Sequence, residues 1–323
     1  MSLPFELKIM RTRKTAVVAI GGNSLIKDDR HQTVAHQLKA ARETCRHIAS
    51  MIEQGWKVII THGNGPQVGF ILLRSELASR LLPTTPLDSC GAETQGSLGY
   101  MIQQSLHNEF KQRDIKNSVA TVVTQVLVKK NDPAFKHPTK PIGPFYSKRK
   151  AERHRREQGW DIMEDAGRGW RRVVPSPKPV CIIEQDVIKS LTDHGVIVIA
   201  AGGGGIPVVE ERGKLKGIEA VIDKDYASAL LAAGIEADLF LISTAVEKVA
   251  LNFGKADEQL LDIITLAEAK KYLKEGHFHA GSMRPKIQAI INYLENGGKE
   301  GIITNPENLE RAILGKTGTH ILP

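Results

Sequence analysis

The sequence predicts an α/β fold in which helices sandwich a central, mostly parallel sheet, with a small protruding subdomain. Three observations indicate it. Apolar segments of strand length end in glycine-rich turns, an amphipathic helical segment separates the first two, and one long irregular segment interrupts the alternation. The chain of 323 residues exceeds a typical domain of roughly 100 to 200, so we expect one large unit or two lobes.

The first strand is predicted at residues 15–20, where the sequence TAVVAI is a continuous apolar run. Such a run is typical of a strand that helices cover on both faces. Gly21, Gly22 and Asn23 follow it directly. Glycines allow backbone N–H groups to approach an anion closely, although the same three residues also suit a plain tight turn.

A helix and a second strand complete the first crossover unit. Residues 31–54 place apolar side chains at alternating spacings of four and three, and residues 56–61 then form an apolar strand-like run. That run leads into a second glycine-rich turn containing Gly63, Asn64 and Gly65. Both turns should lie at the carboxyl edge of a parallel sheet, where such folds bind ligands.

After a predicted helix at residues 90–112 and a strand at 119–124, the pattern breaks. Residues 131–179 contain seven prolines, many charges and no sustained period. A structureless loop of that length is unusual inside a compact domain, so we predict a protruding subdomain, here called the inserted subdomain. Lys140 lies between prolines within it, and we expect this lysine to close over phosphate as part of a lid.

Regular structure resumes with a predicted helix over residues 182–194 and a strand over 196–200. Four consecutive glycines follow, including Gly203 and Gly204. Ordering so many glycines is costly, which indicates that something comes very close to their backbone.

The sequence Asp223-Lys224-Asp225 opens a further predicted helix. A lysine at a helix N-terminus opposes the helix dipole, so Lys224 indicates a nearby anion. Asp223 suits either a helix cap or a functional carboxylate.

A later strand over residues 238–243 ends in Ser243 and in the loop Thr244-Ala245-Val246. Another helix opens near Met283, with Lys286 in its first turn, and strands are expected at residues 301–304 and 319–322. His277 and His279 have no evident third partner for a metal, so no protein metal site is predicted.

The formal net charge of +8 is confined to residues 129–178, which hold 14 basic and 6 acidic residues. Few aromatic residues accompany these charges, which favours a solvated basic face over a nucleic-acid site. No apolar run reaches the length of a membrane span and the N-terminus lacks a signal pattern, so a cytoplasmic location without membrane contact is expected. Cys45, Cys90 and Cys181 are interpreted as packing thiols.

Several blocks in the same order resemble the carbamate kinases, a family of the amino acid kinase fold. The blocks are Gly21 to Asn23, Gly63 to Gly69, Pro138 to Tyr146, Glu164 to Trp170, Gly203 to Pro207, Asp223 to Asp225, and Gly281 to Lys286. The resemblance spans nearly the whole chain. It implies a homodimeric enzyme of arginine metabolism that transfers phosphoryl between ATP and carbamate, with Mg²⁺, giving ADP and carbamoyl phosphate.

The resemblance also implies roles for individual residues. The catalytic residues would be Lys140, Lys224, Asp225 and Lys286. The substrate-binding residues would be Gly21, Gly22, Asn23, Gly63, Asn64 and Gly65. The nucleotide-binding residues would be Gly203, Gly204, Asp223, Ser243, Thr244, Ala245, Val246 and Met283. Residues 14–323 would form the kinase domain, with an N-lobe (about 14–200) for carbamate, a C-lobe (about 201–323) for nucleotide, and residues 1–13 as an extension.

Two positions depart from the family pattern. Serine is usual where His62 stands, and aspartate is usual where Ala245 stands. His62 suits a catalytic role or, more simply, a positioning one. Two other classes of function remain open: a kinase of the same fold acting on acetylglutamate or aspartate, and a non-catalytic nucleic-acid-binding or regulatory protein.

Overall fold

The computed structural model describes residues 14–21, 32–165, 167–279 and 281–323. The predicted extension at residues 1–13 and the predicted ligands Gly22 and Asn23 lie outside the described residues.

An eight-stranded sheet forms the centre of the molecule, and every neighbouring pair is parallel except β16 with β17. Across the sheet the strands are β15 (Ile263–Thr265), β17 (Thr319–Leu322), β16 (Gly301–Thr304), β12 (Leu239–Ser243), β1 (Thr15–Ile20), β2 (Lys57–His62), β9 (Ile197–Ile199) and β3 (Val119–Thr121). This arrangement confirms the predicted fold class.

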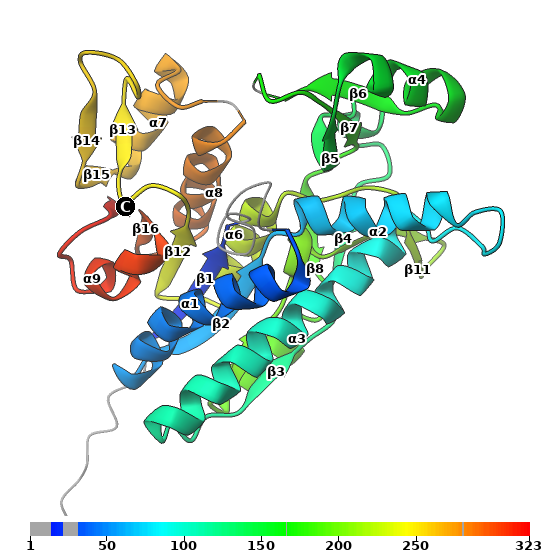
Figure 1. Ribbon diagram of the computed structural model, residues 1–323. Coiled ribbons are helices and arrows are strands. Elements are labelled where there is room, and N and C mark those ends of the chain that lie inside the picture. Colours follow the sequence, from blue (N-terminus) through cyan, green and yellow to red (C-terminus); the bar gives the residue numbers. More distant parts are fainter. Residues whose placement is uncertain (1–13, 22–31, 166, 280) are drawn as a thin grey trace, which may run out of the picture.

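Helices cover both faces of this sheet (Figure 1). On one face lie α1 (Val34–Glu53), α3 (Leu87–Arg113) and α9 (Leu309–Ile313); on the other lie α5 (Gln185–Asp193), α6 (Lys224–Gly234) and α8 (Met283–Glu295). Successive residues of β1 point to opposite faces and are buried on both, Val17 toward α6 and α8, Val18 toward α1 and α3. The unbroken apolar run at residues 15–20 follows from this double burial.

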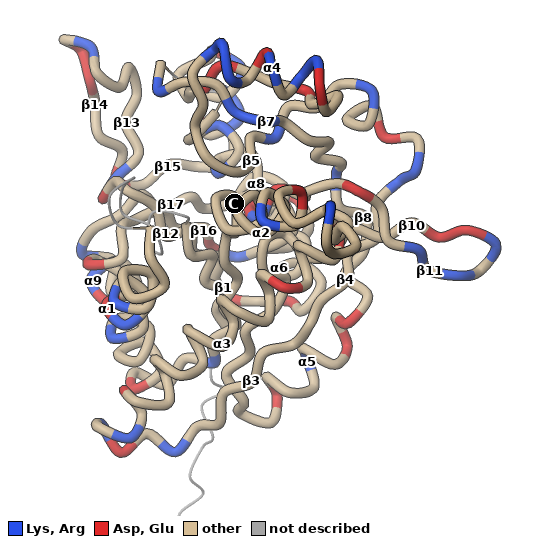
Figure 2. Tube along the Cα trace, turned by 45° about the vertical axis from the view of Figure 1, so that its right-hand side comes forward, with Lys and Arg blue, Asp and Glu red and all other residues tan. Residues whose placement is uncertain are grey.

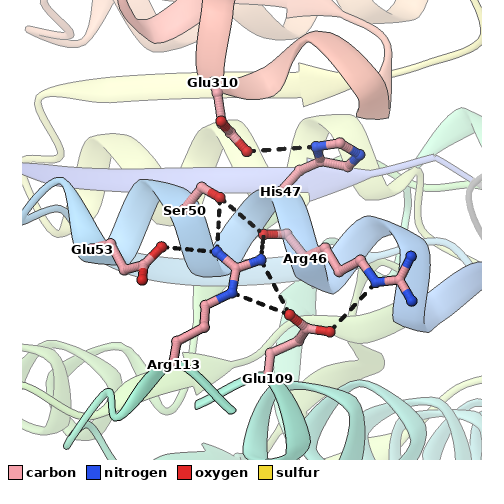
Figure 3. Close-up of polar contacts among 7 residues, drawn as sticks. All are labelled: Arg46, His47, Ser50, Glu53, Glu109, Arg113 and Glu310. Atoms are coloured by element: carbon pink, nitrogen blue, oxygen red, sulfur yellow. Dashed lines mark hydrogen bonds and ion pairs between the residues drawn. The ribbon is translucent and has the colours of Figure 1, made fainter.

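A polar cluster joins α1 to the C-terminal end of α3 (Figure 3). The guanidinium of Arg113 donates from Nη1 to Glu53 Oε2 at 2.8 Å and to Ser50 Oγ at 2.9 Å, and from Nη2 to the Arg46 carbonyl oxygen at 3.0 Å. Its Nε donates to Glu109 Oε2 at 3.2 Å. Glu53 and Arg113 lie at the C-terminal ends of α1 and α3, whereas the Gly63–Gly65 turn contacts the N-terminal part of α3. The cluster therefore stabilises the packing of the two helices at the end away from that turn.

The inserted subdomain forms an antiparallel sheet in the order β5 (Lys140–Tyr146), β7 (Trp170–Val174), β6 (Asp161–Glu164), with α4 (Lys148–Gln158) packed on it. It projects at the upper right of Figure 1. Basic residues gather on α4 (Figure 2). Contact with α2 (Gly65–Leu77) depends on a glycine pair, because a Cβ on Gly69 would lie 2.1 Å from the backbone of Gly143.

A second sheet connects the inserted subdomain to the rest of the chain. Its strands are β11 (Lys214–Gly217), β10 (Ile206–Glu211), β4 (Gln125–Val128) and β8 (Pro179–Ile182). Ile182 pairs with Val126 in this sheet, so the helix predicted from residue 182 begins at Gln185 instead. The predicted strand at residues 119–124 likewise ends at Thr121 before β4 begins.

Residues 247–276 carried no structural prediction, and they form β13 (Val249–Leu251), β14 (Gln259–Leu261), β15 and α7 (Leu266–Glu275). Each of these strands has only three residues, too few for an alternating pattern to be recognised. Of the three cysteines, Cys45 and Cys90 are buried and Cys181 is exposed, so Cys181 is not a packing thiol. No helix among the described residues has the length and apolar character needed to cross a membrane.

Candidate active site

The ends of three strands, each followed by a predicted binding loop, lie at one edge of the main sheet. β1 lies between β2 and β12, and all three run parallel. Ile20, at the end of β1, pairs with His62 on one side and with Ser243 on the other. The Gly63–Gly65 turn and the Thr244–Val246 loop therefore start at the same level, as the sequence predicted.

Asp225 holds two lysines that come from different helices. Its carboxylate accepts hydrogen bonds from Lys224 and, at 3.1 Å, from Nζ of Lys286, near the start of α8. Burial alone would raise the pKa of the Asp225 carboxyl, but the two ammonium groups outweigh it and hold that pKa well below its usual range. The carboxylate is therefore charged at all ordinary pH values and fixes the positions of both cations.

The two lysines differ in the net direction of their pKa shift. Burial lowers the pKa of Lys224, and the attraction of Asp225 only partly offsets that effect. For Lys286, burial also acts to lower the pKa, but Asp225 outweighs it and the net shift is upward. Both ammonium groups are largely buried and share one carboxylate, so each would gain from an added anion. Both lysines are therefore candidates for direct contact with phosphate.

Asp223 links the inserted subdomain to α6. One of its oxygens accepts from Nζ of Lys140, the first residue of β5, at 2.6 Å. The other accepts from the backbone N–H of Asp225 at 2.9 Å, which caps α6. The predicted helix cap is therefore confirmed, and the same carboxylate also pairs with Lys140, while a functional role for Asp223 stays a prediction.

A first cavity of about 280 Å³ lies beneath the inserted subdomain. Most of the predicted catalytic and acceptor-side residues line it: Gly63, Asn64, Gly65, Lys140, Lys224, Asp225 and Lys286. Gly203 and Asp223, which were predicted to bind nucleotide, also line it. Asp165, Arg168 and Arg171 of the inserted subdomain also contribute to its wall.

A second cavity of about 390 Å³ adjoins the first. The predicted site residues that line it are Gly21, Lys224, Thr244, Ala245, Val246, Met283 and Lys286. Lys224 and Lys286 line both cavities, so a group passing from one ligand to the other would lie beside these two ammonium groups. A larger hollow of about 740 Å³ along α6 and α8 is lined by none of the predicted site residues.

Some predicted residues line a different cavity from the other residues with the same predicted role, or line neither cavity. Gly21, assigned to substrate, lines the second cavity, whereas Gly203 and Asp223, assigned to nucleotide, line the first. Ser243 and Gly204 line neither cavity. The Ser243 carbonyl oxygen instead accepts from the N–H of Gly21 at 3.0 Å, which joins the ends of β12 and β1.

The run of glycines at residues 202–205 is required by neighbouring protein atoms. A Cβ on Gly203, whose φ is +67°, would lie 2.1 Å from Nδ2 of Asn64. A Cβ on Gly202 would lie 2.3 Å from Nε2 of His62. The sequence correctly indicated a close approach to this backbone, and the approaching groups belong to the chain itself, among them the side chains of His62 and Asn64 and the backbone of Ile222.

His62 is a buried, neutral residue beneath this turn. Burial is the main cause that lowers its pKa to about 4, the contact with the Gly63 carbonyl acts in the opposite direction, and nearby Lys224 lowers it further. Nδ1 lies 3.1 Å from that carbonyl oxygen, and since a carbonyl only accepts, Nδ1 carries the proton. This placement supports a positioning role.

Sequence reasoning missed the side chains of α3 that hold both turns. Thr94 Oγ1 accepts from Nδ2 of Asn64 at 2.8 Å. Gln95 donates from Nε2 to the Gly202 carbonyl oxygen at 3.1 Å and to that of Thr124 at 3.0 Å. These buried polar residues occupy a helix in which no site residue was predicted. Lys248, Phe253, His277 and His279 of the second cavity were also missed as cavity-lining residues.

The donors at this site suit a magnesium ion that arrives with the nucleotide. The described residues contain no group of three His, Cys, Asp or Glu side chains able to hold a metal ion. Asp223 and Asp225 are the carboxylates beside the predicted catalytic lysines, and each already holds lysine. Mg²⁺ is commonly bound by substrate phosphates together with one or two carboxylates, which this site can supply.

Comparisons with known proteins agree with this geometry. The model of the amino acid kinase family matches residues 14–305. The carbamate kinase of Pyrococcus furiosus is 50% identical over 312 residues, covering 96% of this chain and 99% of that protein. The carbamate kinase-like protein YahI of Escherichia coli is 51% identical, covering 96% and 99%. A structure of carbamate kinase from Giardia lamblia bound to AMP-PNP has a TM-score of 0.89 and 42% identity, covering 96% and 99%.

Proposed function

The chain belongs to the amino acid kinase family, and from this premise we propose that it catalyses the carbamate kinase reaction, reversible phosphoryl transfer between ATP and carbamate. The observation that carries the proposal is that Lys224 and Lys286 line two adjoining cavities. One cavity would hold the nucleotide and the other the acceptor, with the transferred phosphoryl between them.

The chemistry asks mainly for charge neutralisation and alignment. A carbamate oxygen attacks the γ-phosphorus of ATP, the bond from that phosphorus to the bridging oxygen breaks, and ADP leaves with the electron pair. Carbamate is already an anion with a nucleophilic oxygen, so no general base is required. Lys140, Lys224 and Lys286 would offset the charge that builds up as two anions meet.

Asp225 would act by orientation. Because both of its oxygens are bonded to lysines, it keeps two cations at fixed positions before substrates bind. Such preorganised charge costs no reorganisation during the reaction. Asp223 would do the same for Lys140 while the inserted subdomain closes as a lid.

The proposal extends to features that accompany this activity. Mg²⁺ would enter with ATP or ADP and screen the phosphate charge. We also propose a cytoplasmic homodimer that acts in arginine metabolism, with an N-lobe for carbamate and a C-lobe for nucleotide. Lys140 of the proposed N-lobe and Lys224 and Lys286 of the proposed C-lobe all line the first cavity, which supports this division.

The two departures from the family pattern lie on opposite sides of that junction. His62 lies beneath the Gly202 turn of the first cavity, and Ala245 lines the second. A direct measurement of turnover with several acceptors therefore tests whether either position alters the substrate preference.

The test is ATP formation from ADP and carbamoyl phosphate with Mg²⁺, followed by the forward reaction with carbamate, N-acetylglutamate or aspartate. We expect turnover with carbamoyl phosphate and carbamate and none with the other two acids. Lys224→Met provides the inactive control. Turnover with N-acetylglutamate or aspartate instead would assign the chain to a different acyl kinase, and no turnover with any substrate would refute the proposal.

A further inference from the structure

We propose that Arg168 is a further acceptor-binding cation, held in place by Asp165 at the mouth of the first cavity. The inference rests on the proposed function and assigns Arg168 to the anionic acceptor, carbamate or the carbamoyl end of carbamoyl phosphate. It gives a role to the conspicuous stretch at residues 164–170, which the chemistry described above does not use.

Asp165 holds two arginines as Asp225 holds two lysines. Its Oδ1 accepts from Nη2 of Arg168 at 3.2 Å, and its Oδ2 accepts from Nη1 of Arg171 at 3.1 Å. Arg171 also donates from Nε to the Gly143 carbonyl oxygen at 3.1 Å. The side chain of Arg171 is 12% exposed and that of Arg168 is 61% exposed. Arg171 is thus part of the support, and Arg168 is the arginine open to a ligand.

The backbone around Arg168 is fixed by the turn between β6 and β7. The N–H of Asp165 donates to the Gly169 carbonyl oxygen at 2.8 Å, and the N–H of Arg168 donates to the Asp165 carbonyl oxygen at 3.1 Å. The guanidinium carbon of Arg168 also lies 4.9 Å from the centre of the Phe145 ring. A guanidinium stacked on a ring keeps its plane while its edge N–H groups remain available.

The wall of the first cavity identifies the anion. Asp165, Arg168 and Arg171 line this cavity together with the Gly63–Gly65 turn and Lys140, and none of the three lines the second cavity beside Thr244–Val246. A planar guanidinium matches the two oxygens of a carboxylate or phosphate group. Arg168 is therefore placed for the acceptor, and its loss should affect the acceptor far more than the nucleotide.

The experiment compares Arg168→Ala with Arg156→Ala in the full-length protein, using ADP and carbamoyl phosphate. Arg156 is an exposed arginine on α4 of the same subdomain and does not line the first cavity. We expect Arg168→Ala to raise the KM for carbamoyl phosphate at least tenfold while the KM for ADP changes less than about twofold. Arg156→Ala should leave both constants unchanged.

Two further measurements separate contact from a structural effect. Added guanidinium ion should restore part of the lost activity of Arg168→Ala, and Arg168→Lys should keep more affinity than Arg168→Ala, because each returns a cation to the site. Equal KM values for Arg168→Ala and Arg156→Ala in an active enzyme would overturn the inference and leave the proposed function standing. An increase confined to the KM for ADP would overturn the inference as well.

Discussion

Two clusters of charged residues in this molecule look alike but differ in how many hydrogen-bond donors of their cations remain available to a ligand. The Arg113 cluster places one arginine among two carboxylates, a serine and a backbone carbonyl (Figure 3). The Asp225 cluster places one carboxylate between two lysines. In the first, most of the donors of the cation are bonded to the protein. In the second, two ammonium groups share one carboxylate as their acceptor.

Counting donors shows why only one cluster can bind an anion. Each lysine ammonium has three N–H donors. Within the described residues, Lys224 and Lys286 each have one side-chain hydrogen bond, to Asp225. Lys224 and Lys286 line both cavities, whereas Arg113 lines neither of them. Unused donors beside a cavity therefore identify the functional cluster, while the number of ion pairs does not.

The largest expected effect comes from removing the organising charge with Asp225→Asn. Without the carboxylate, two neighbouring ammonium groups repel and lose their fixed positions. We expect kcat to fall about 100- to 1,000-fold, or roughly 3 to 4 kcal/mol of transition-state stabilisation. Steady-state kinetics with carbamoyl phosphate and ADP measures it, with circular dichroism to show that the variant is folded.

Asp223→Asn is the matched comparison, because asparagine keeps the cap of α6 and weakens only the hold on Lys140. It should be milder than Asp225→Asn. If folded Asp225→Asn loses less than tenfold in kcat, roughly 1.4 kcal/mol, then Asp225 does not organise the lysines for catalysis.

The next effect in size is expected from Lys140→Ala. Lys140 reaches the first cavity from the inserted subdomain, is 27% exposed, and has Asp223 as its ion-pair partner. We expect kcat to fall about 30- to 100-fold while the KM for ADP stays within about threefold, because in the proposed mechanism the lysine contacts the transferring group and not the nucleotide. Lys130→Ala, which removes only an exposed pair with Glu211, is the control. Weakened ADP binding with normal turnover of bound substrate would exclude the lid role.

The positions of the turns could be predicted from sequence, because each depends on local pattern. β1, β2 and β12 are apolar runs that end in glycine or small polar residues, and parallel strands place such ends together. Lys224 was recognised because a lysine at a helix start is locally unfavourable. In each case a short segment carries its own signal.

Pairing between distant residues could not be predicted from such signals. Lys140 and Asp223 are 83 positions apart, and Asp225 and Lys286 are 61 apart, so no local period connects them. Gln95 looked like an ordinary helix residue, because its function depends on Thr124 and Gly202 arriving from other elements. The division into two cavities also depends on how these elements pack.

Arg113→Met tests whether the Arg113 cluster contributes to stability and not to catalysis. It removes the hydrogen bonds that join Arg113 to α1 and leaves the largely buried Glu109 carboxylate with Arg46 as its remaining ion-pair partner. We expect a loss of about 2 kcal/mol in the free energy of unfolding, discounted because the pair is partly exposed. The kcat measured below the unfolding transition should stay unchanged. Urea denaturation gives the first quantity, and a parallel loss of kcat would mean that the two clusters are coupled.

The smallest effect concerns His62, which lies between the glycine turn and Lys224. Its pKa falls from 6.5 to about 4 on folding, chiefly through burial, so below pH 6.5 the unfolded chain binds a proton that the folded chain does not. Its contribution is complete above pH 6.5 and is lost as the pH falls toward 4. Between pH 7 and pH 5 this amounts to roughly 1.5 to 2 kcal/mol of unfolding free energy.

Other groups also change their protonation with pH in the same experiment, so comparison with His62→Gln is needed to isolate the contribution of His62. Glu300 raises the pKa of His320, so that histidine stabilises the fold at low pH and loses its effect as the pH rises, opposite to His62. The Asp225 carboxylate loses its contribution only at still lower pH. Urea denaturation at pH 7 and pH 5 should therefore show a smaller decrease for His62→Gln than for the unmodified protein. Equal decreases would mean that His62 is protonated in the folded state at pH 5, which would place a further cation near Lys224.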